Sequence, residues 1–301
     1  MDVHTTTSAT IIINPIAGGG TVHAAERNAR LALSIAEGLH VPADVFVTTH
    51  VGHARELAAA AAGRGADLVM AWGGDGTINE VMSALVGRDV ALGIVPAGSG
   101  NGLARELGID RRPQQAIAAA LHARPRPIDV GEIDGRYFVN TAGIGFDAHI
   151  ASRFATARRR GFLGYAGITA RALTSYVPLE YRVGIPGRPP LHVRAVLLTL
   201  ANSAQFGNGA LIAPGAQVDD GELDLVVFQE RSRFHTVCAL PRLFNGTVHQ
   251  VAGCTITRVG EVTIEADAPL TYHLDGEPVV GGTTLHARIH PAALRVAVAG
   301  N

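Results

Sequence analysis

Short runs of apolar, β-branched residues alternate with alanine-rich stretches over the first 121 residues of the chain. Four such runs predict strands, at residues 9–14, 44–49, 67–72 and 90–96. Between the first two runs, apolar residues recur at helical spacing, at Val22, Ala25, Ala29, Leu33 and Ala36. This alternation is typical of a parallel sheet covered by helices, with right-handed crossovers.

After residues 123–127 the pattern changes to a series of extended segments. They lie at residues 127–133, 136–143, 179–185, 191–202, 222–228, 261–266, 270–277 and 285–290. Such a series predicts a second, largely antiparallel domain. Helical patterns interrupt it at about residues 146–175 and 231–246, and the last apolar run, 294–299, fits an edge strand of either domain.

Composition is that of a globular protein without an obvious nucleic-acid surface. The 301 residues are 47% hydrophobic and 17% charged, which suits about two domains with sizeable cores. The formal net charge is −1, and Arg158–Arg160 is the longest run of like charges, so we expect no affinity for nucleic acid. All 25 basic residues are arginines.

The positions of the cysteines and histidines argue against a disulfide-linked protein and against a zinc protein. Cys238 and Cys254 are far apart and lack metal-ligand spacing, and the 13 histidines show no zinc-binding pattern. We therefore expect a cytoplasmic protein without disulfides or zinc. We also expect no export signal and no membrane-spanning segment.

Three of the predicted strands end in glycine-rich loops, at residues 14–20, 73–77 and 96–102. In an open α/β sheet, ligands bind beyond the carboxyl ends of the strands, so these loops can converge on one crevice. Glycine exposes backbone N–H groups, and the helix that follows adds its positive dipole end, which together favour an anion. Each loop alone is also consistent with a simple turn, but three together favour nucleotide phosphate.

The middle loop carries a helix-start signal and a carboxylate. Thr77 and Glu80 match a Thr-x-x-Glu capping box, which predicts that a helix begins just after the glycines. Neither a P-loop nor a Gly-x-Gly-x-x-Gly fingerprint is present. A carboxylate at Asp75 would repel a triphosphate unless a divalent cation or a proton intervened, so it favours Mg²⁺-nucleotide and phosphoryl transfer.

Six segments, in order, resemble the diacylglycerol kinase catalytic family. They are "NPIAGG", "GGDGTINEV", "PAGSGNGLAR", "DVGEIDGRYFVNTAGIGFDA", "DDGELDLVV" and "LDGE". The resemblance implies an N-terminal Rossmann-like, doubly wound parallel-sheet domain that binds nucleotide (1–126). It also implies a C-terminal antiparallel β-sandwich domain that binds lipid and metal (127–290), with an active-site cleft between them. A last strand, 291–301, either returns to the first domain or stays with the second.

The resemblance also implies the reaction and its site. ATP would give its γ-phosphate to a lipid hydroxyl, with Mg²⁺ as a second cofactor. The implied ATP contacts are Asn14, Pro15, Ile16, Ala17, Gly18, Thr48, Gly74, Asp75, Gly76, Thr77, Ile78, Asn79, Glu80 and Ser99. The implied magnesium ligands are the Asp220 carboxylate and the backbone oxygens of Gln217 and Glu222.

Two carboxylates compete for the role of proton acceptor. We expect Glu277 to accept the proton of the lipid hydroxyl and Asp75 to organise Mg²⁺, water and the acceptor; the reverse assignment stays open. Taken alone, "LDGE" at 274–277 predicts only a hairpin turn, because Asp-Gly is a strong turn signal. The magnesium at Asp220 fits a structural role as well as a catalytic one.

The identity of the acceptor is less well defined. In the third loop Asn101 is followed by Gly102, which resembles the sphingosine- and ceramide-kinase version of the family and leaves the acceptor lipid open. An NAD-kinase-like enzyme and a non-catalytic lipid or nucleotide sensor are the alternatives to a lipid kinase. The oligomeric state also stays open, a homodimer included.

The segment 154–176 combines basic and apolar residues. Arg158, Arg159 and Arg160 stand beside Phe162, Leu163, Tyr165, Ile168 and Leu173. This mixture suits either transient contact with the inner face of a membrane, where a lipid substrate would be presented, or an amphipathic helix packed on the sandwich.

Overall fold

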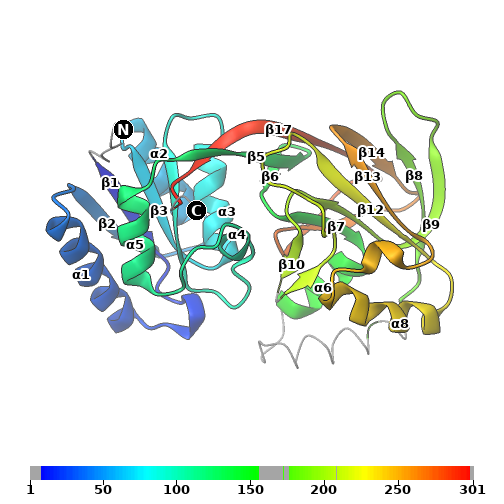
Figure 1. The fold of residues 1–301 in the computed structure, drawn as a ribbon, viewed down its shortest axis with the longest axis horizontal. Helices are drawn as coiled ribbons and strands as arrows, with labels where there is room; N and C mark the ends of the chain where they lie inside the picture. Colours follow the sequence, from blue (N-terminus) through cyan, green and yellow to red (C-terminus); the bar gives the residue numbers. More distant parts are fainter. Residues whose placement is uncertain (1–7, 156–171, 173–175, 208, 299–301) are drawn as a thin grey trace. The chain divides into compact units, whose positions relative to one another are not determined.

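The computed structural model describes residues 8–155, 172, 176–207 and 209–298 (Figure 1). The chain divides into two compact units. The N-terminal unit comprises Met1–Ile128 together with Ala292–Asn301, and the C-terminal unit comprises Asp129–Pro291. Among the described residues, no helix is both long enough and apolar enough to span a membrane.

The N-terminal unit contains the predicted parallel sheet. Its strands are β1 (Ala9–Ile13), β2 (Ala43–Val47), β3 (Leu68–Gly73) and β4 (Ala91–Pro96), in the order β4-β3-β1-β2. All three pairings are parallel, which confirms the four predicted strands. Every residue of β1, β3 and β4 is buried, as their nearly continuous apolar sequences require.

Helices connect these strands and cover the sheet (Figure 1). They are α1 (Val22–Gly38), α2 (His53–Gly63), α3 (Asp75–Leu85), α4 (Gly102–Glu106) and α5 (Pro113–His122), with a short 3₁₀ turn at Ala17–Gly19. The helices α1 and α5 share one hydrophobic cluster with alternate residues of β1, and α2 contacts α3. This arrangement places the carboxyl ends of the parallel strands at one edge of the sheet.

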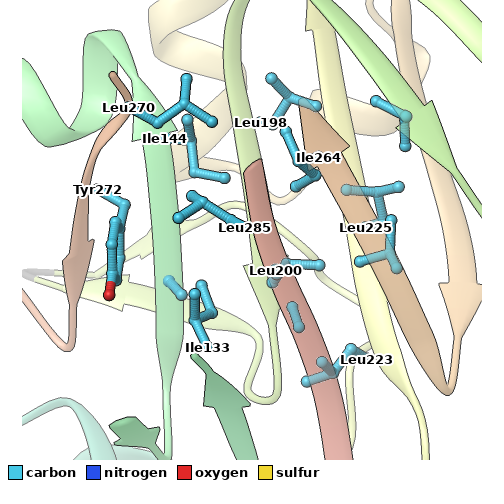
Figure 2. Packing of buried hydrophobic residues seen from close by; sticks show 14 of the residues in the cluster. Ile133, Ile144, Leu198, Leu200, Leu223, Leu225, Ile264, Leu270, Tyr272 and Leu285 are labelled. Atoms are coloured by element: carbon cyan, nitrogen blue, oxygen red, sulfur yellow. The ribbon is translucent and has the colours of Figure 1, made fainter. Parts of the chain in front are cut away.

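The C-terminal unit is an antiparallel β-structure, as predicted. Its strands are β5 (Arg126–Ile133), β6 (Arg136–Phe138), β7 (Thr141–Gly145), β8 (Leu179–Gly184), β9 (Leu191–Ala201), β10 (Gln205–Gly207), β11 (Ala210–Leu211), β12 (Leu223–Gln229), β13 (Cys254–Val259), β14 (Glu261–Glu265), β15 (Thr271–Leu274), β16 (Glu277–Val280) and β17 (Thr284–Val296). Figure 2 shows their inward-facing side chains, including Leu198, Leu225 and Ile264, packed in one hydrophobic core.

Two helices of the C-terminal unit lie where helical patterns are predicted. The helix α6 (Phe146–Ala155) follows β7, and α8 (Arg233–Phe244) follows β12, with a 3₁₀ turn at Val248–Gln250. The remainder of the predicted 146–175 helical region lies outside the described residues, apart from Ala172.

Two features of the strands differ from the sequence prediction. The segment predicted as one strand at 136–143 forms two short strands, β6 and β7. Four strands, β10, β11, β13 and β16, are not among the predicted segments, apart from Glu277 at the start of β16; of these, β13 pairs with β12 over six residue pairs.

The last apolar run belongs to the N-terminal sheet. The strand β17 pairs antiparallel with β14 through residues 284–288. Farther along, Arg295 and Val296 pair with Ala91 and Leu92 of β4 in parallel. The last part of β17 is therefore an edge strand of the parallel sheet, beside β4.

Candidate active site

The three glycine loops meet at the carboxyl ends of β1, β3 and β4. A Cβ atom on Gly18 in the first loop would lie 2.5 Å from the carbonyl oxygen of Ala97 in the third loop. A Cβ on Gly98 would lie 2.7 Å from the Cα of Gly74 in the second loop. Both distances are shorter than real Cβ contacts, so only glycine allows the backbones to approach this closely.

Asp75 joins the second loop to the third. It is the first residue of α3, and its Oδ1 and Oδ2 accept hydrogen bonds from the backbone N–H groups of Gly102 (2.7 Å) and Asn101 (2.9 Å). Burial raises the pKa of this carboxyl above its ordinary value, and the N–H groups of Gly102 and Asn101 oppose the rise. Asp75 is therefore a partly buried, desolvated acid held at the junction of two loops.

Asn101 fixes the shape of the third loop, a role that the sequence analysis did not assign. Its backbone is left-handed, with φ of 52°, and only 2% of the residue is exposed. Its side-chain Oδ1 accepts from the N–H of Gly98 and its Nδ2 donates to the carbonyl of Gly98, both at 2.8 Å. Asparagine tolerates this backbone region better than most residues, which is the only local signal of the role.

Asn14 links the first loop to the second. Its side-chain Nδ2 donates to Oγ1 of Thr77 in α3 at 2.9 Å, and its Oδ1 accepts from the N–H of Ile16 at 3.1 Å. Thr77 is buried. The predicted nucleotide-binding residues Asn14, Gly18, Gly74, Asp75 and Thr77 are thus brought together in one network.

The predicted capping box is wrong. The helix α3 begins at Asp75, two residues before Thr77, so Thr77 lies inside the helix and bonds to Asn14. The Glu80 carboxylate instead accepts from the N–H groups of Gly52 (2.9 Å) and Ala54 (3.1 Å), at the beginning of α2. Glu80 caps a neighbouring helix, which the local sequence pattern does not reveal.

Replacing Glu80 with alanine is expected to destabilise the protein by about 1–2 kcal/mol, because two N–H groups at the start of α2 lose their acceptor. Gly52 has no side chain that could replace it. Urea unfolding would measure the change. The matched control is Glu56→Ala in the first turn of α2. Glu56 is exposed, and its ion pair with His50, at 3.6 Å, lies on the surface and contributes little to stability. Equal stability of the two variants would contradict the capping role.

The remaining predicted ATP contacts differ in what they can offer. The N–H of Thr48 donates to the carbonyl of Ile13 at 2.9 Å, so Thr48 lies beside the end of β1. Ser99 is exposed at the tip of the third loop. The side chain of Ile78 belongs to the core, with 1% exposed, and its N–H donates to the carbonyl of Gly74 at 3.0 Å, so neither can meet a ligand. Pro15, Ile16, Ala17, Gly76 and Asn79 lie within the same loops and the first turns of α3.

Fewer loop N–H groups are available for phosphate than the sequence predicts. The N–H groups of Gly19 and Gly20 donate within the first loop, and that of Gly98 donates to Asn101. The first turn of α3 supplies better donors, because the first N–H groups of a helix have no carbonyl partner inside it. Within this candidate site, the beginning of α3, next to Asp75, is the element best suited to an anion.

Glu277 follows a tight hairpin turn between β15 and β16, as "LDGE" predicts. Asp275 and Gly276 form the turn, with φ of 50° and 92°. The Asp275 carboxylate accepts from three backbone N–H groups, at residues 139, 140 and 141, over 2.8–3.2 Å. The turn is therefore anchored, and Glu277 is exposed at its end.

A buried ion pair lies behind this hairpin. Nε2 of His273 is 2.8 Å from Oδ2 of Asp147 in α6, and both side chains are less than 5% exposed. Nδ1 of His273 accepts from the N–H of Gly276 at 3.2 Å. A Cβ on Gly143 would lie 1.6 Å from Oδ2 of Asp147, so glycine is required there. Neither Asp147 nor His273 was assigned a role from the sequence.

The predicted magnesium ligands lie in the turn before β12. Oδ1 of Asp220 accepts from the N–H of Glu222 at 3.1 Å, and Oδ2 of Asp220 is 3.6 Å from Nη2 of Arg258. Nη1 of Arg258 is 3.3 Å from Oε2 of Glu222. Burial raises the pKa of nearby Asp224; Arg258 opposes this rise, and Asp220 and Glu222 add to it.

Asp129 holds this acidic turn in place. Its Oδ2 accepts from the N–H of Gly221 at 2.7 Å, and its own N–H donates to the carbonyl of Val218 at 2.7 Å. Within the described part of the chain, no group of three or more His, Cys, Asp or Glu side chains could hold a metal ion. The predicted ligand set needs only one carboxylate and two backbone oxygens, and such oxygen donors fit Mg²⁺.

The basic and apolar segment predicted to contact a membrane cannot be placed. Arg158, Arg159 and Arg160, with the apolar residues from Phe162 to Leu173, lie outside the described residues.

Comparison with known proteins agrees with both units. Residues 8–133 match the model of the diacylglycerol kinase catalytic domain, and residues 140–298 match that of the YegS C-terminal NAD kinase beta sandwich-like domain. A crystal structure of a diacylglycerol kinase from Bacillus anthracis (strain Sterne) has the same fold. Its TM-score is 0.74 and its identity 19%, over 97% of each chain.

Two curated relatives are similar in sequence over most of their length. A "Diacylglycerol kinase" from Mycobacterium tuberculosis is 31% identical over 304 residues, covering 97% of this chain and 96% of the relative. A "Probable lipid kinase YegS-like" protein from Pseudomonas aeruginosa is 34% identical over 256 residues, covering 84% and 83%. The chain thus belongs to the diacylglycerol kinase family, whose members are phosphotransferases that use ATP and act on an alcohol group.

Proposed function

We propose that this protein transfers the γ-phosphate of Mg-ATP to a hydroxyl of a lipid such as diacylglycerol, a sphingoid base or phosphatidylglycerol. The observation that carries the proposal is the network of three loops around Asp75 at the beginning of α3. It combines a helix N-terminus, which attracts phosphate, with a partly buried acid, which needs a cation or a proton close to a triphosphate. The names of the relatives support a lipid as the acceptor.

Glu277 is our candidate for the proton acceptor. A lipid alcohol becomes a better nucleophile when a carboxylate accepts its proton as the bond to phosphorus forms. Glu277 is exposed and stands on a turn that Asp275 fixes through three N–H groups, which suits a group that must meet a bulky substrate in one orientation.

Asp75 fits the role of organiser better than that of base. Each of its carboxylate oxygens already accepts a backbone hydrogen bond from the third loop. Taking up a proton in each cycle would weaken these bonds. A role in holding the loops, and through them the phosphates, needs these hydrogen bonds at every stage of the cycle.

Mg²⁺ would neutralise charge on the transferring phosphate when bound. Asp75 is positioned to orient it or its water, because carboxylate oxygens retain further lone pairs after accepting one N–H group each. In the C-terminal unit, the Asp220 carboxylate and the backbone oxygens of Gln217 and Glu222 are the proposed ligands. An Asp220→Asn variant distinguishes the two roles of that second ion. Loss of a structural ion would lower stability, and loss of a catalytic ion would lower turnover.

The test is transfer of labelled phosphate from ATP to a panel of diacylglycerol, sphingosine, ceramide, phosphatidylglycerol and NAD. We expect a phosphorylated lipid, and Glu277→Gln is expected to lower kcat about 100-fold or more with little change in the KM for ATP. Glu261→Gln is the matched control, since Glu261 is also an exposed strand residue of the C-terminal unit.

Other results would contradict parts of this proposal. Wild-type turnover in Glu277→Gln would remove Glu277 as the base. Phosphorylated NAD as the only product would indicate a small-molecule kinase, and binding without turnover on every acceptor would indicate a sensor.

A further inference from the structure

The helix α8 exposes an apolar stripe. Val237 is 50% exposed and Phe244 48%, and Pro241 between them is also exposed. Their spacing of four and then three residues places all three on one side of the helix. Single exposed apolar residues are common on protein surfaces, but an aligned set on a helix face that meets water usually marks an interaction site.

The opposite side of α8 is fixed to the C-terminal unit. Thr236 and Ala239 are buried, and Ala239 shares a hydrophobic cluster with Phe228 of β12. At the beginning of the helix, Oγ of Ser232 accepts from the N–H of His235 at 3.1 Å. The helix is therefore held by its buried face and cap, and the stripe of Val237, Pro241 and Phe244 faces outward.

Charge around the stripe is positive. From Arg231 to Gly260 the sequence has arginines at 231, 233, 242 and 258 and contains no Asp or Glu. Arg258 is paired with Asp220, Glu222 and Asp224 and adds no net positive charge near the stripe. Glu230, just before this segment, is 2.5 Å from the guanidinium of Arg194. Arg242, exposed at the end of α8, donates to Thr247 and Gln250, which hold it near the stripe. Arginine beside exposed apolar residues complements an anionic lipid surface.

We propose that this face of α8 docks on a bilayer that contains anionic phospholipid. Val237, Pro241 and Phe244 enter the boundary between headgroups and acyl chains, and Arg231 and Arg242 meet the headgroups. The choice of a bilayer over a protein partner rests on the proposed function, since a lipid acceptor has to be reached in a membrane, and on the absence of acidic residues. The contact is a reversible one, because three apolar side chains bury little area.

Sedimentation with vesicles of phosphatidylglycerol and phosphatidylcholine in equal amounts tests the proposal. The double variant Val237→Ser/Phe244→Ser is expected to bind about tenfold more weakly or worse, because most of the apolar area that leaves water is lost. Leu33→Ser on α1 is the matched control: Leu33 is 44% exposed on a helix of the N-terminal unit, and its replacement should leave binding unchanged. Arg242→Gln should weaken binding at low salt more than at high salt.

Three outcomes would overturn the docking surface. They are wild-type protein that does not sediment with these vesicles, a double variant that binds as wild type does, and a lipid-free dimer that the double variant converts to a monomer. The last would assign the stripe to a second copy of the chain. Circular dichroism and turnover on detergent-dispersed lipid would verify that the double variant is folded.

The docking surface and the proposed function fail in different ways. Vesicle binding needs no phosphoryl transfer. A protein that phosphorylates no lipid, but whose vesicle binding is lost in the double variant, would refute the proposed function and support the docking surface. A protein that phosphorylates lipid, but whose double variant binds vesicles normally, would support the proposed function and refute the docking surface.

Discussion

Asp75→Asn is expected to lower turnover by about 100-fold or more while leaving the protein folded, because a small misplacement of the phosphate-binding loops is enough to cost this much. The asparagine side chain has one acceptor oxygen where the carboxylate has two. Its NH₂ group would face the N–H of either Asn101 or Gly102, which now donate to Asp75. The third loop would then shift away from α3.

The pH dependence of stability distinguishes this variant from a simple loop defect. The pKa of Asp75 is raised in the folded protein, mainly by burial, so the folded state holds its proton to higher pH than the unfolded state does. Wild type therefore loses stability relative to Asp75→Asn as pH rises from the ordinary value of 3.8 through the pKa of the folded protein. The variant has no such titration.

Urea unfolding of both proteins at a series of pH values, together with kcat and the KM for ATP, would measure these effects. Asp44→Asn, at an exposed position of β2, is the control and should change neither quantity. A difference in unfolding free energy that does not vary with pH would contradict the buried, proton-holding state of Asp75. Near-normal turnover would remove it from the site.

The strands β1, β3 and β4 of the N-terminal unit were predictable because their apolar runs are buried on both faces and so read alike in sequence and structure. The division of residues 136–145 into β6 and β7 could not be predicted from the sequence. The backbone N–H groups at residues 139–141 donate to Asp275, which is more than 130 positions away in the chain. The strand β13 was also missed, because most of its residues are only partly buried or exposed, which blurs the alternation that marks a strand.

The same limit applies to the site. Glycine loops at strand ends, and an acid among them, were visible in the sequence, and so was the turn that carries Glu277. The hydrogen-bond partners of Asp75 and Glu80 were not visible in the sequence. Asp75 bonds to residues 26 and 27 positions away, and Glu80 bonds to residues 28 and 26 positions before it. A Thr-x-x-Glu pattern is local, so it could not show that Glu80 caps a different helix.

Removing the carboxylate of Asp147 is expected to have the largest effect on stability. Asp147→Ala should cost about 3–5 kcal/mol, because a buried imidazole then loses its charged partner. Asp147→Asn should cost less, since its oxygen can still accept a hydrogen bond from Nε2 of His273.

The pH dependence of this loss follows from the pKa of His273. Burial alone would lower that pKa, but the carboxylates that face the ring, Asp147 at 2.8 Å and Asp275, raise it above the ordinary value of 6.5. The ion pair therefore contributes fully below pH 6.5 and is lost as pH rises through the pKa of the folded protein. The stability gap between wild type and Asp147→Asn should be widest in acid and should narrow toward alkaline pH.

Denaturant unfolding of wild type, Asp147→Ala and Asp147→Asn across this range would decide the matter, with turnover measured on the same samples. Nδ1 of His273 lies 3.2 Å from the backbone nitrogen of Gly276, one residue before Glu277, and accepts its N–H only while the ring is neutral. Because Asp147→Asn changes the position and the charge of this ring, it should also lower kcat while the KM for ATP stays constant. A gap that does not change with pH would mean that His273 is neutral throughout. An unchanged kcat in a destabilised Asp147→Asn would confine the pair to holding the fold of the C-terminal unit.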